Sequence, residues 1–124
     1  MELVEAELSD KIIGCAIQVH RLLGPGFLER VYEEALLIEL RKAGLQAERQ
    51  KQLTIFYDQV AIGEHRLDLV VENRVVIELK ACKAVEDVHL ATVRSYLKAS
   101  RLQLGLTLNF AKPTLEIRRV VLSA

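Results

Sequence analysis

The sequence predicts a mixed α/β domain in which helices flank a single β-sheet, and three observations lead to this fold class. Apolar residues recur at helical spacing in two segments near the N-terminus and in a third after residue 87. Five short runs rich in Val, Leu and Ile alternate with turn-forming residues and are typical of strands. The chain has 124 residues without repeats or linkers, so we expect one domain over residues 1–124.

The first helix is expected after a frayed lead-in at residues 1–8. Ser9 and Asp10 are favourable N-caps, and the helix is predicted to run to about Leu23. Its broad apolar face is formed by Ile12, Ile13, Ala16, Ile17, Val19 and His20.

The second helix has an acidic end on an otherwise apolar stripe. Pro25 or Gly26 is expected to open it, and Gly44 to cap it after Ala43. The stripe consists of Glu29, Glu33, Leu36 and Leu40, at positions i, i+4, i+7 and i+11. An acid in a first turn is favoured by the helix dipole, by about 0.3–1 kcal/mol. Alternatively, Glu29 points into a site at the edge of the core.

The rest of the chain is expected to supply the sheet and one more helix. Three antiparallel strands are predicted at residues 50–57, 60–71 and 75–80, with turns at 58–59 and 72–74 and Gly63 as a candidate break. A loop at 81–87, a helix at 88–100 capped by Asp87, and strands at 104–110 and 115–122 complete the order ααβββαββ. Two rows run along the last helix: His89, Thr92, Tyr96 and Ala99 form one, and Arg94, Lys98 and Arg101 the other.

Composition excludes several classes of protein. Lys plus Arg and Asp plus Glu both number 17, so global charge gives no attraction to a polyanion or a membrane. Cys15 and Cys82 lack metal-type spacing and predict a reduced, cytoplasmic protein. No apolar run is long enough to span a bilayer, and the N-terminus is acidic where a signal peptide would be basic.

The strongest chemical signal is the set Asp68, Glu78 and Lys80, which interrupts two otherwise apolar strands. Charged groups rarely enter such strands without a partner or a metal. Glu78 and Lys80 share a face because they lie two residues apart. A two-residue turn would place Asp68 opposite Ile77, whereas a three-residue turn at 72–74 would place Asp68 opposite Glu78.

If the two carboxylates converge, they cannot both stay charged and dry without a cation. Mg²⁺ needs only one or two carboxylates, with water and a substrate phosphate as its other ligands. Lys80 could then activate a metal-bound water or stabilise charge on the phosphate, which is the chemistry of phosphodiester hydrolysis. The structural alternative is an ion network among the three residues, or a Lys80 that extends from the strand end to solvent.

The order Asp68, then Glu78-Leu79-Lys80, resembles the D…(D/E)-x-K signature of the PD-(D/E)XK nuclease superfamily. The segment VHRLLGPGFLERVYEE at residues 19–34 resembles the opening of the small bacterial GxxExxY family within it, with Gly26, Glu29 and Tyr32 as the named letters. The stretches at 68–72, 78–81, 96–98 and 105–110 follow the family's pattern in order, so the resemblance covers residues 12–121.

This resemblance implies a restriction-endonuclease-like fold with an αβββαβ core and Mg²⁺ or Mn²⁺ as the cofactor. It implies metal ligation by Asp68, Glu78 and the Leu79 carbonyl, with Glu29 as the helix-borne acid near the metal and Lys80 as the catalytic lysine. Tyr96 is expected at the edge of the site.

The chain departs from the family at one position. The family usually carries Gln four residues before the tyrosine that matches Tyr96, and this sequence has Thr92 there. Threonine cannot make the paired hydrogen bonds of an amide, which weakens the case for an intact site. His89, one turn earlier, either compensates or is structural. Arg94 and Lys98 either contact a phosphate backbone or form a solvated face.

We therefore expect a metal-dependent nuclease that acts on DNA with weak or structure-directed specificity, as a homodimer or as a subunit of a larger complex. The alternatives are a catalytically inactive nucleic-acid-binding or protein-interaction module, and an RNA-directed hydrolase.

Overall fold

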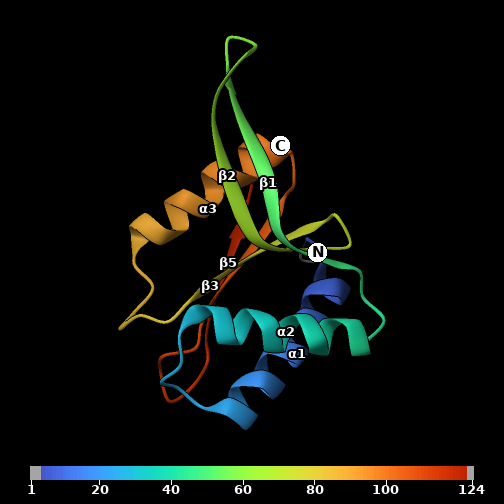
Figure 1. The fold of residues 1–124 in the computed structure, drawn as a ribbon, viewed down its shortest axis with the longest axis vertical. Coiled ribbons are helices and arrows are strands. Elements are labelled where there is room, and N and C mark those ends of the chain that lie inside the picture. The colour runs from blue at the N-terminus through green and yellow to red at the C-terminus, as the bar shows by residue number, and fades with distance from the viewer. Residues whose placement is uncertain (1–3, 123–124) are drawn as a thin grey trace.

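The computed structural model describes residues 4–122, which form three helices and one five-stranded sheet (Figure 1). The elements are α1 (Ala6–Leu23), α2 (Glu29–Lys42), β1 (Ala47–Tyr57), β2 (Val60–Val71), β3 (Val75–Lys80), α3 (Asp87–Ser100), β4 (Leu104–Asn109) and β5 (Glu116–Val121). This confirms the predicted order ααβββαββ.

The sheet has the strand order β1-β2-β3-β4-β5. Its neighbouring strands are antiparallel except β3 and β4, which are parallel and joined by α3. Helices α1 and α2 cover one face of the sheet and α3 packs on the other (Figure 1). The predicted mixed sheet flanked by helices is therefore confirmed.

Each face of the sheet has its own apolar core. The core on the α1/α2 side includes Leu36, Leu40, Leu69, Ile77 and Phe110. The core on the α3 side includes Leu67, Val70, Val76, Val93 and Leu97. No helix within residues 4–122 is both long and apolar enough to cross a lipid bilayer.

Helix α1 begins before Ser9, so residues 6–8 are helical and the expected frayed lead-in is wrong for them. Ser9 is buried, and its hydroxyl accepts a hydrogen bond from Arg119 of β5 at 2.9 Å. Burial of Leu8 in the core stabilises this additional turn, because helical stability comes mainly from tertiary packing. Residues 1–3 of the expected lead-in lie outside the described residues.

Helix α2 starts at Glu29, and the prediction that Pro25 or Gly26 opens it is wrong. Gly24 and Gly26 have φ values of 69° and 118°, which no α-helix contains. These residues therefore form an irregular loop that delays the helix. The helix ends at Lys42 with Ala43 as its C-cap, one residue earlier than predicted, and Gly44, with φ 80°, follows that cap.

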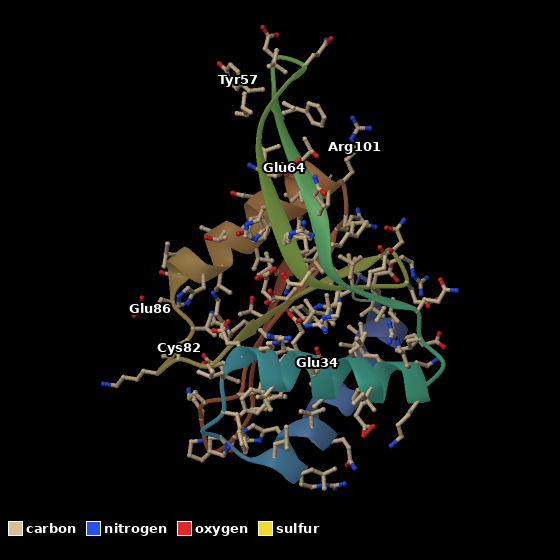
Figure 2. The ribbon with its side chains drawn as sticks, viewed as in Figure 1. Glu34, Tyr57, Glu64, Cys82, Glu86 and Arg101 are labelled. Carbon is tan, nitrogen blue, oxygen red and sulfur yellow. The ribbon has the colours of Figure 1, made fainter. Side chains whose placement is uncertain are left out.

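Strands β1 and β2 extend beyond the rest of the sheet as a two-stranded arm, with Tyr57 near its tip (Figures 1 and 2). The predicted turn at Asp58–Gln59 is present, with φ values of 50° and 64°. Gly63 does not break β2; instead it pairs with Ile55, and the register shifts between Ile55 and Phe56. The exposed apolar side chains of the arm are Phe56, Tyr57, Val60 and Ile62.

Candidate functional site

The connection between β2 and β3 sets the register that places Asp68 opposite Glu78. Val71 pairs with Val75, as the three-residue connection 72–74 requires. Two consecutive residues of this connection have positive φ values, 53° and 52°, which suits the tight turns of hairpins. Of the two turns that the sequence allowed, the structure has the one that brings the acids together.

Backbone pairing between β2 and β3 ends at Leu69 and Ile77. Beyond this pair, the side-chain carboxylates of Asp68 and Glu78, instead of backbone carbonyls, face the backbone amides of the neighbouring strand. Oδ2 of Asp68 accepts a hydrogen bond from the amide of Leu79 at 2.8 Å, and the amide nitrogen of Asp68 lies 3.5 Å from Oε1 of Glu78. Both acids are thus held at the fork where the two strands separate.

Burial, with the charges of neighbouring acids, raises the pKa values of both Asp68 and Glu78. Glu78 is only 8% exposed. Its burial, and to a lesser degree the charge of Asp68, raises the pKa of Glu78 from 4.5 to about 8. Burial also raises the pKa of Asp68, although the hydrogen bond from Leu79 opposes this. At neutral pH the pair therefore either holds a proton or needs a cation.

Lys80 follows Glu78 on the same face of β3. Together with Asp68, both side chains line a hollow of about 230 Å³ on the α3 side of the sheet. The charge of Lys80 lowers the pKa values of both acids, but less than burial raises them. Within residues 4–122, neither acid forms a salt bridge, so the ion network considered as an alternative is not formed.

Glu29 reaches the same end of the sheet from the first turn of α2. Its Oε2 accepts a hydrogen bond from the amide of Ala81, the residue that follows β3, at 3.2 Å. Tyr32, one turn along the helix, fixes the preceding loop, because its hydroxyl donates to the carbonyl of Gly24 at 2.6 Å. The buried ring of Tyr32 stacks on Phe110 at 4.5 Å. This anchored tyrosine determines where the helix starts and hence where Glu29 projects.

Asp68 and Glu78, together with a backbone carbonyl oxygen, suit a hard divalent cation. A cluster of three carboxylates is not formed among the described residues. In the described part of the chain, no three His, Cys, Asp or Glu side chains are grouped closely enough to hold a metal ion. Glu29 is therefore not grouped with Asp68 and Glu78 in this structure, and its place among the metal ligands stays a prediction. A buried carboxylate, Glu78, and a half-buried one, Asp68, without an ion-pair partner among residues 4–122 match Mg²⁺, which takes one or two carboxylates and keeps several waters. The carbonyl of Leu79 is a candidate further ligand.

Helix α3 forms the opposite wall of the hollow with His89, Thr92, Val93 and Tyr96. The ring of Tyr96 stacks on His65 of β2 at 4.1 Å, and its hydroxyl lies 3.4 Å from Nδ1 of His65. Burial, followed by the charges of Glu78 and Asp68, raises the pKa of Tyr96, so its hydroxyl lies within the field of the acids. Tyr96 therefore lies at the edge of the candidate site.

Thr92 and His89, on the same wall, have local partners. The hydroxyl of Thr92 donates to the carbonyl of Val88 at 2.9 Å, and Nδ1 of His89 accepts a hydrogen bond from the amide of Glu86 at 2.9 Å. Glu86 is therefore the N-cap of α3, and the predicted cap, Asp87, is its first residue. Thr92 therefore has no amide group to offer in the hollow. One ring nitrogen of His89 is used in the N-terminal cap of α3.

Arg94 and Lys98 are exposed on α3 and do not line the hollow. The structure thus brings Tyr96 and Thr92 to the acids but leaves these two cations outside. Their contact with a phosphate backbone stays a prediction.

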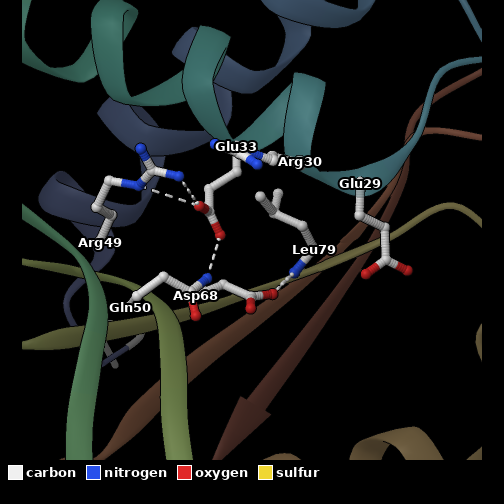
Figure 3. Close-up of a pocket in the computed structure, with 7 residues that line it drawn as sticks. All are labelled: Glu29, Arg30, Glu33, Arg49, Gln50, Asp68 and Leu79. Carbon is white, nitrogen blue, oxygen red and sulfur yellow. Dashed lines mark hydrogen bonds and ion pairs between the residues drawn. The ribbon is translucent and has the colours of Figure 1, made fainter.

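A second hollow, of about 340 Å³, adjoins the first and shares Glu29, Asp68 and Leu79 with it (Figure 3). Here Oε2 of Glu33 accepts hydrogen bonds from Arg49 at 3.2 and 3.0 Å, and Oε1 accepts one from Gln50 at 2.7 Å. The sequence pattern gave no indication of Arg49 and Gln50, because polar residues near the start of a strand carry no local signal. Their partner, Glu33, lies on another element and is 5% exposed.

Comparisons with known proteins agree with this architecture. A family model described as the PD-(D/E)XK nuclease superfamily matches residues 6–120. A solved structure titled "Crystal structure of SSO0001" is similar with a TM-score of 0.59 and 14% identity over 77% of this chain and 50% of that chain. This chain thus spans about half the length of that structure, and the likeness concerns the fold alone. No curated protein matches the chain. The single mixed sheet flanked by helices is consistent with a restriction-endonuclease-like α/β fold.

Proposed function

The chain belongs to the PD-(D/E)XK nuclease superfamily, and from this premise we propose that it hydrolyses phosphodiester bonds of nucleic acid with a bound divalent metal ion. The observation that carries the proposal is the convergence of Asp68 and Glu78 beside Lys80 in one hollow. Both acids have raised pKa values, and neither has an ion-pair partner among residues 4–122. A cation would remove the repulsion between them.

Each polar group at the fork has a role in this proposal. Asp68 and Glu78 bind the metal ion through their carboxylates, with the carbonyl of Leu79 as a further oxygen. The chemistry that a divalent ion such as Mg²⁺ or Mn²⁺ would supply there is polarisation of the phosphate and a lower pKa for water. Lys80 holds the attacking water and stabilises the charge that develops on the phosphate. Glu29 acts from outside the ligand set, by adding negative charge near the metal.

The wall opposite the strands positions the substrate. Tyr96 and Thr92 line the hollow, and Arg94 and Lys98 lie on the exposed side of the same helix, where flanking phosphates could pass. We propose DNA as the substrate. We propose weak or structure-directed specificity because a net charge of zero gives no global attraction to a polyanion. A homodimer or a larger complex would supply additional contacts.

Within the superfamily, we propose that the chain is of the GxxExxY type. Each of the three motif residues has a structural role that supports this assignment. Gly26 has a φ of 118°, which favours glycine, and Tyr32 donates a hydrogen bond into the loop before α2. Glu29 is the residue that this loop delivers to the end of β3.

A catalytically inactive nucleic-acid-binding or protein-interaction module is the second candidate function. Thr92 favours it, because its hydroxyl is bonded to its own helix and replaces the amide that the resemblance leads us to expect. Such a module would keep the fold and bind nucleic acid without cleaving it.

The first test is cleavage of labelled single-stranded, duplex and branched DNA, with matched RNA, in Mg²⁺ or Mn²⁺. Asp68→Asn and Lys80→Ala remove a ligand and the lysine. Asp58→Asn, at the arm tip, and Lys42→Ala, on the exposed side of α2, are matched controls. We expect cleavage by the wild type and both controls, and none by the two site variants.

The outcome separates the two candidate functions. Cleavage retained by both site variants would contradict the proposed mechanism. No cleavage and no calorimetric signal for metal binding by the folded wild type would favour the inactive module. Preference among the substrates decides between DNA and RNA.

A further inference from the structure

Gln50 has a left-handed backbone conformation in the middle of β1, with a φ of 51°. Residues other than glycine rarely adopt this conformation within a strand, and it persists only where the surroundings enforce it. Strained residues of this kind occur preferentially at functional sites. Gln50 lines the second hollow together with Asp68 (Figure 3).

The strand register places Gln50 directly opposite Asp68. The flanking pairs are Arg49 with Leu69 and Lys51 with Leu67, and the ladder skips the position between them. The break in β1 therefore lies at the same level as the acid of β2.

Side-chain alternation along β2 is interrupted at this level. Leu67 and Val70 both pack in the core on the α3 side, whereas Leu69 packs in the core on the α1/α2 side. In a regular strand, residues three apart face opposite sides, so the pleat is shifted around Asp68. The shift explains why Asp68 lines hollows on both sides of the sheet.

Two hydrogen bonds hold Gln50 in its conformation. Its side-chain Nε2 donates to Oε1 of Glu33 at 2.7 Å (Figure 3), and its carbonyl accepts from Nη1 of Arg66 at 3.1 Å. Glu33 is itself buried and fixed by Arg49 through its other oxygen. The bend of β1 is thus tied to α2 at one end and to β2 at the other.

We propose that Gln50 is a positioning residue for Asp68. Its bent backbone, held by Glu33, shifts the pleat of β2 so that the Asp68 carboxylate turns to the fork beside Glu78. The inference rests on the proposed function, because the alignment of Asp68 is measured through metal binding. Residues that orient metal ligands typically alter metal affinity or activity by about 10–100-fold when they are replaced.

The test is calorimetry of Mg²⁺ or Mn²⁺ binding to the full chain, together with steady-state cleavage. Gln50→Leu removes the amide and favours extended backbone, whereas Gln50→Gly removes the amide but accepts a φ of 51° without strain. Gln52→Leu is the matched control, since Gln52 lies in the same strand and donates to Glu64 of the arm.

We expect Gln50→Leu to weaken metal binding by about 10-fold or more and to lower kcat, with KM for DNA unchanged. Gln50→Gly should lose less affinity, and Gln52→Leu should lose none. Wild-type metal affinity and kcat in Gln50→Leu would overturn the positioning role and leave the proposed function intact. Failure of the wild type itself to bind metal and cleave would instead contradict the proposed function.

If Gln50→Leu does not fold, Gln50→Ala and Gln50→Gly carry the test. These variants differ by one methyl group, and both lack the amide. Tighter metal binding by the glycine variant supports the role of the backbone conformation, and equal binding overturns it.

Discussion

Oε2 of Glu29 accepts a hydrogen bond from the amide of Ala81 at 3.2 Å, across a sequence separation of 52 residues. The bond joins the first turn of α2 to the residue that follows β3. It holds a carboxylate beside the fork of β2 and β3 without adding it to a three-carboxylate cluster, which is absent from residues 4–122. The acid reaches this place only because α2 packs on the sheet.

Replacement of Glu29 by Gln is expected to lower the cleavage rate by about 10-fold without unfolding the chain. The amide oxygen can still accept from Ala81, so the change removes only the charge. Single-turnover cleavage at saturating metal measures the effect. Glu7→Gln on α1 serves as the control, and a wild-type rate in Glu29→Gln would contradict a role for the charge.

Metal affinity is expected to increase with pH up to about 8, because the pKa of Glu78 is about 8 and a proton must leave before the carboxylate binds metal. Calorimetry of Mg²⁺ binding at a series of pH values measures this dependence. Glu78→Gln should bind metal weakly and lose the dependence. A constant affinity across neutral pH in the wild type would show that Glu78 is not a ligand.

The metal-free protein is expected to lose stability as pH rises. A carboxyl group whose pKa is higher in the folded state binds more protons there than in the unfolded state, so the free energy of unfolding falls with pH. For Glu78 the window lies between the ordinary value of 4.5 and about 8. Urea denaturation in EDTA across this window checks the sign. In Glu78→Gln the decline should become shallower, and an increase with pH in the wild type would refute the prediction.

Gly105→Ala is expected to destabilise the fold by about 1–3 kcal/mol through overpacking. A Cβ atom at Gly105 of β4 would lie 2.5 Å from Cγ1 of Val93, so α3 would have to move away from the sheet. Gly14→Ala in α1 is the control, because its Cβ meets nothing within 4 Å and alanine favours a helix by about 0.5–1 kcal/mol. Chemical denaturation should give opposite signs for the two variants.

Thr92→Gln is expected to increase cleavage, because a glutamine amide could reach into the hollow that Thr92 lines. The hydroxyl of Thr92 is bonded to the carbonyl of Val88 and offers little to a substrate. Cleavage kinetics of the variant beside the wild type measure the gain. Unchanged kinetics would show that this position does not limit the site.

Local patterns predicted most of the fold and the centre of the site. The sequence limited the turn at 72–74 to two hairpin registers, and one of them pairs Asp68 with Glu78. The structure has that register. Glu78 and Lys80 share a face through strand periodicity alone. These three residues lie on one hairpin, so local information is enough to place them opposite one another, whereas the direction of the Asp68 carboxylate also depends, in our proposal, on β1.

Tertiary packing decided the remaining features. The starts of α1 and α2 differ from prediction because burial of Leu8 extends one helix and positive-φ glycines delay the other. The bond between Gln50 and Glu33 was not predictable, because its partners lie 17 positions apart on a strand and a helix.

The sequence by itself therefore determined the element order, the two registers open to the hairpin and the acids that one of these registers joins, and the structure decided between the two. Only the tertiary structure decided how Glu29 meets the end of β3 and how the bend at Gln50 turns Asp68. The physical reason is that strand and helix periodicities act between near neighbours along the chain. Contacts between side chains of separate elements depend on how those elements pack, and local sequence patterns do not predict this packing.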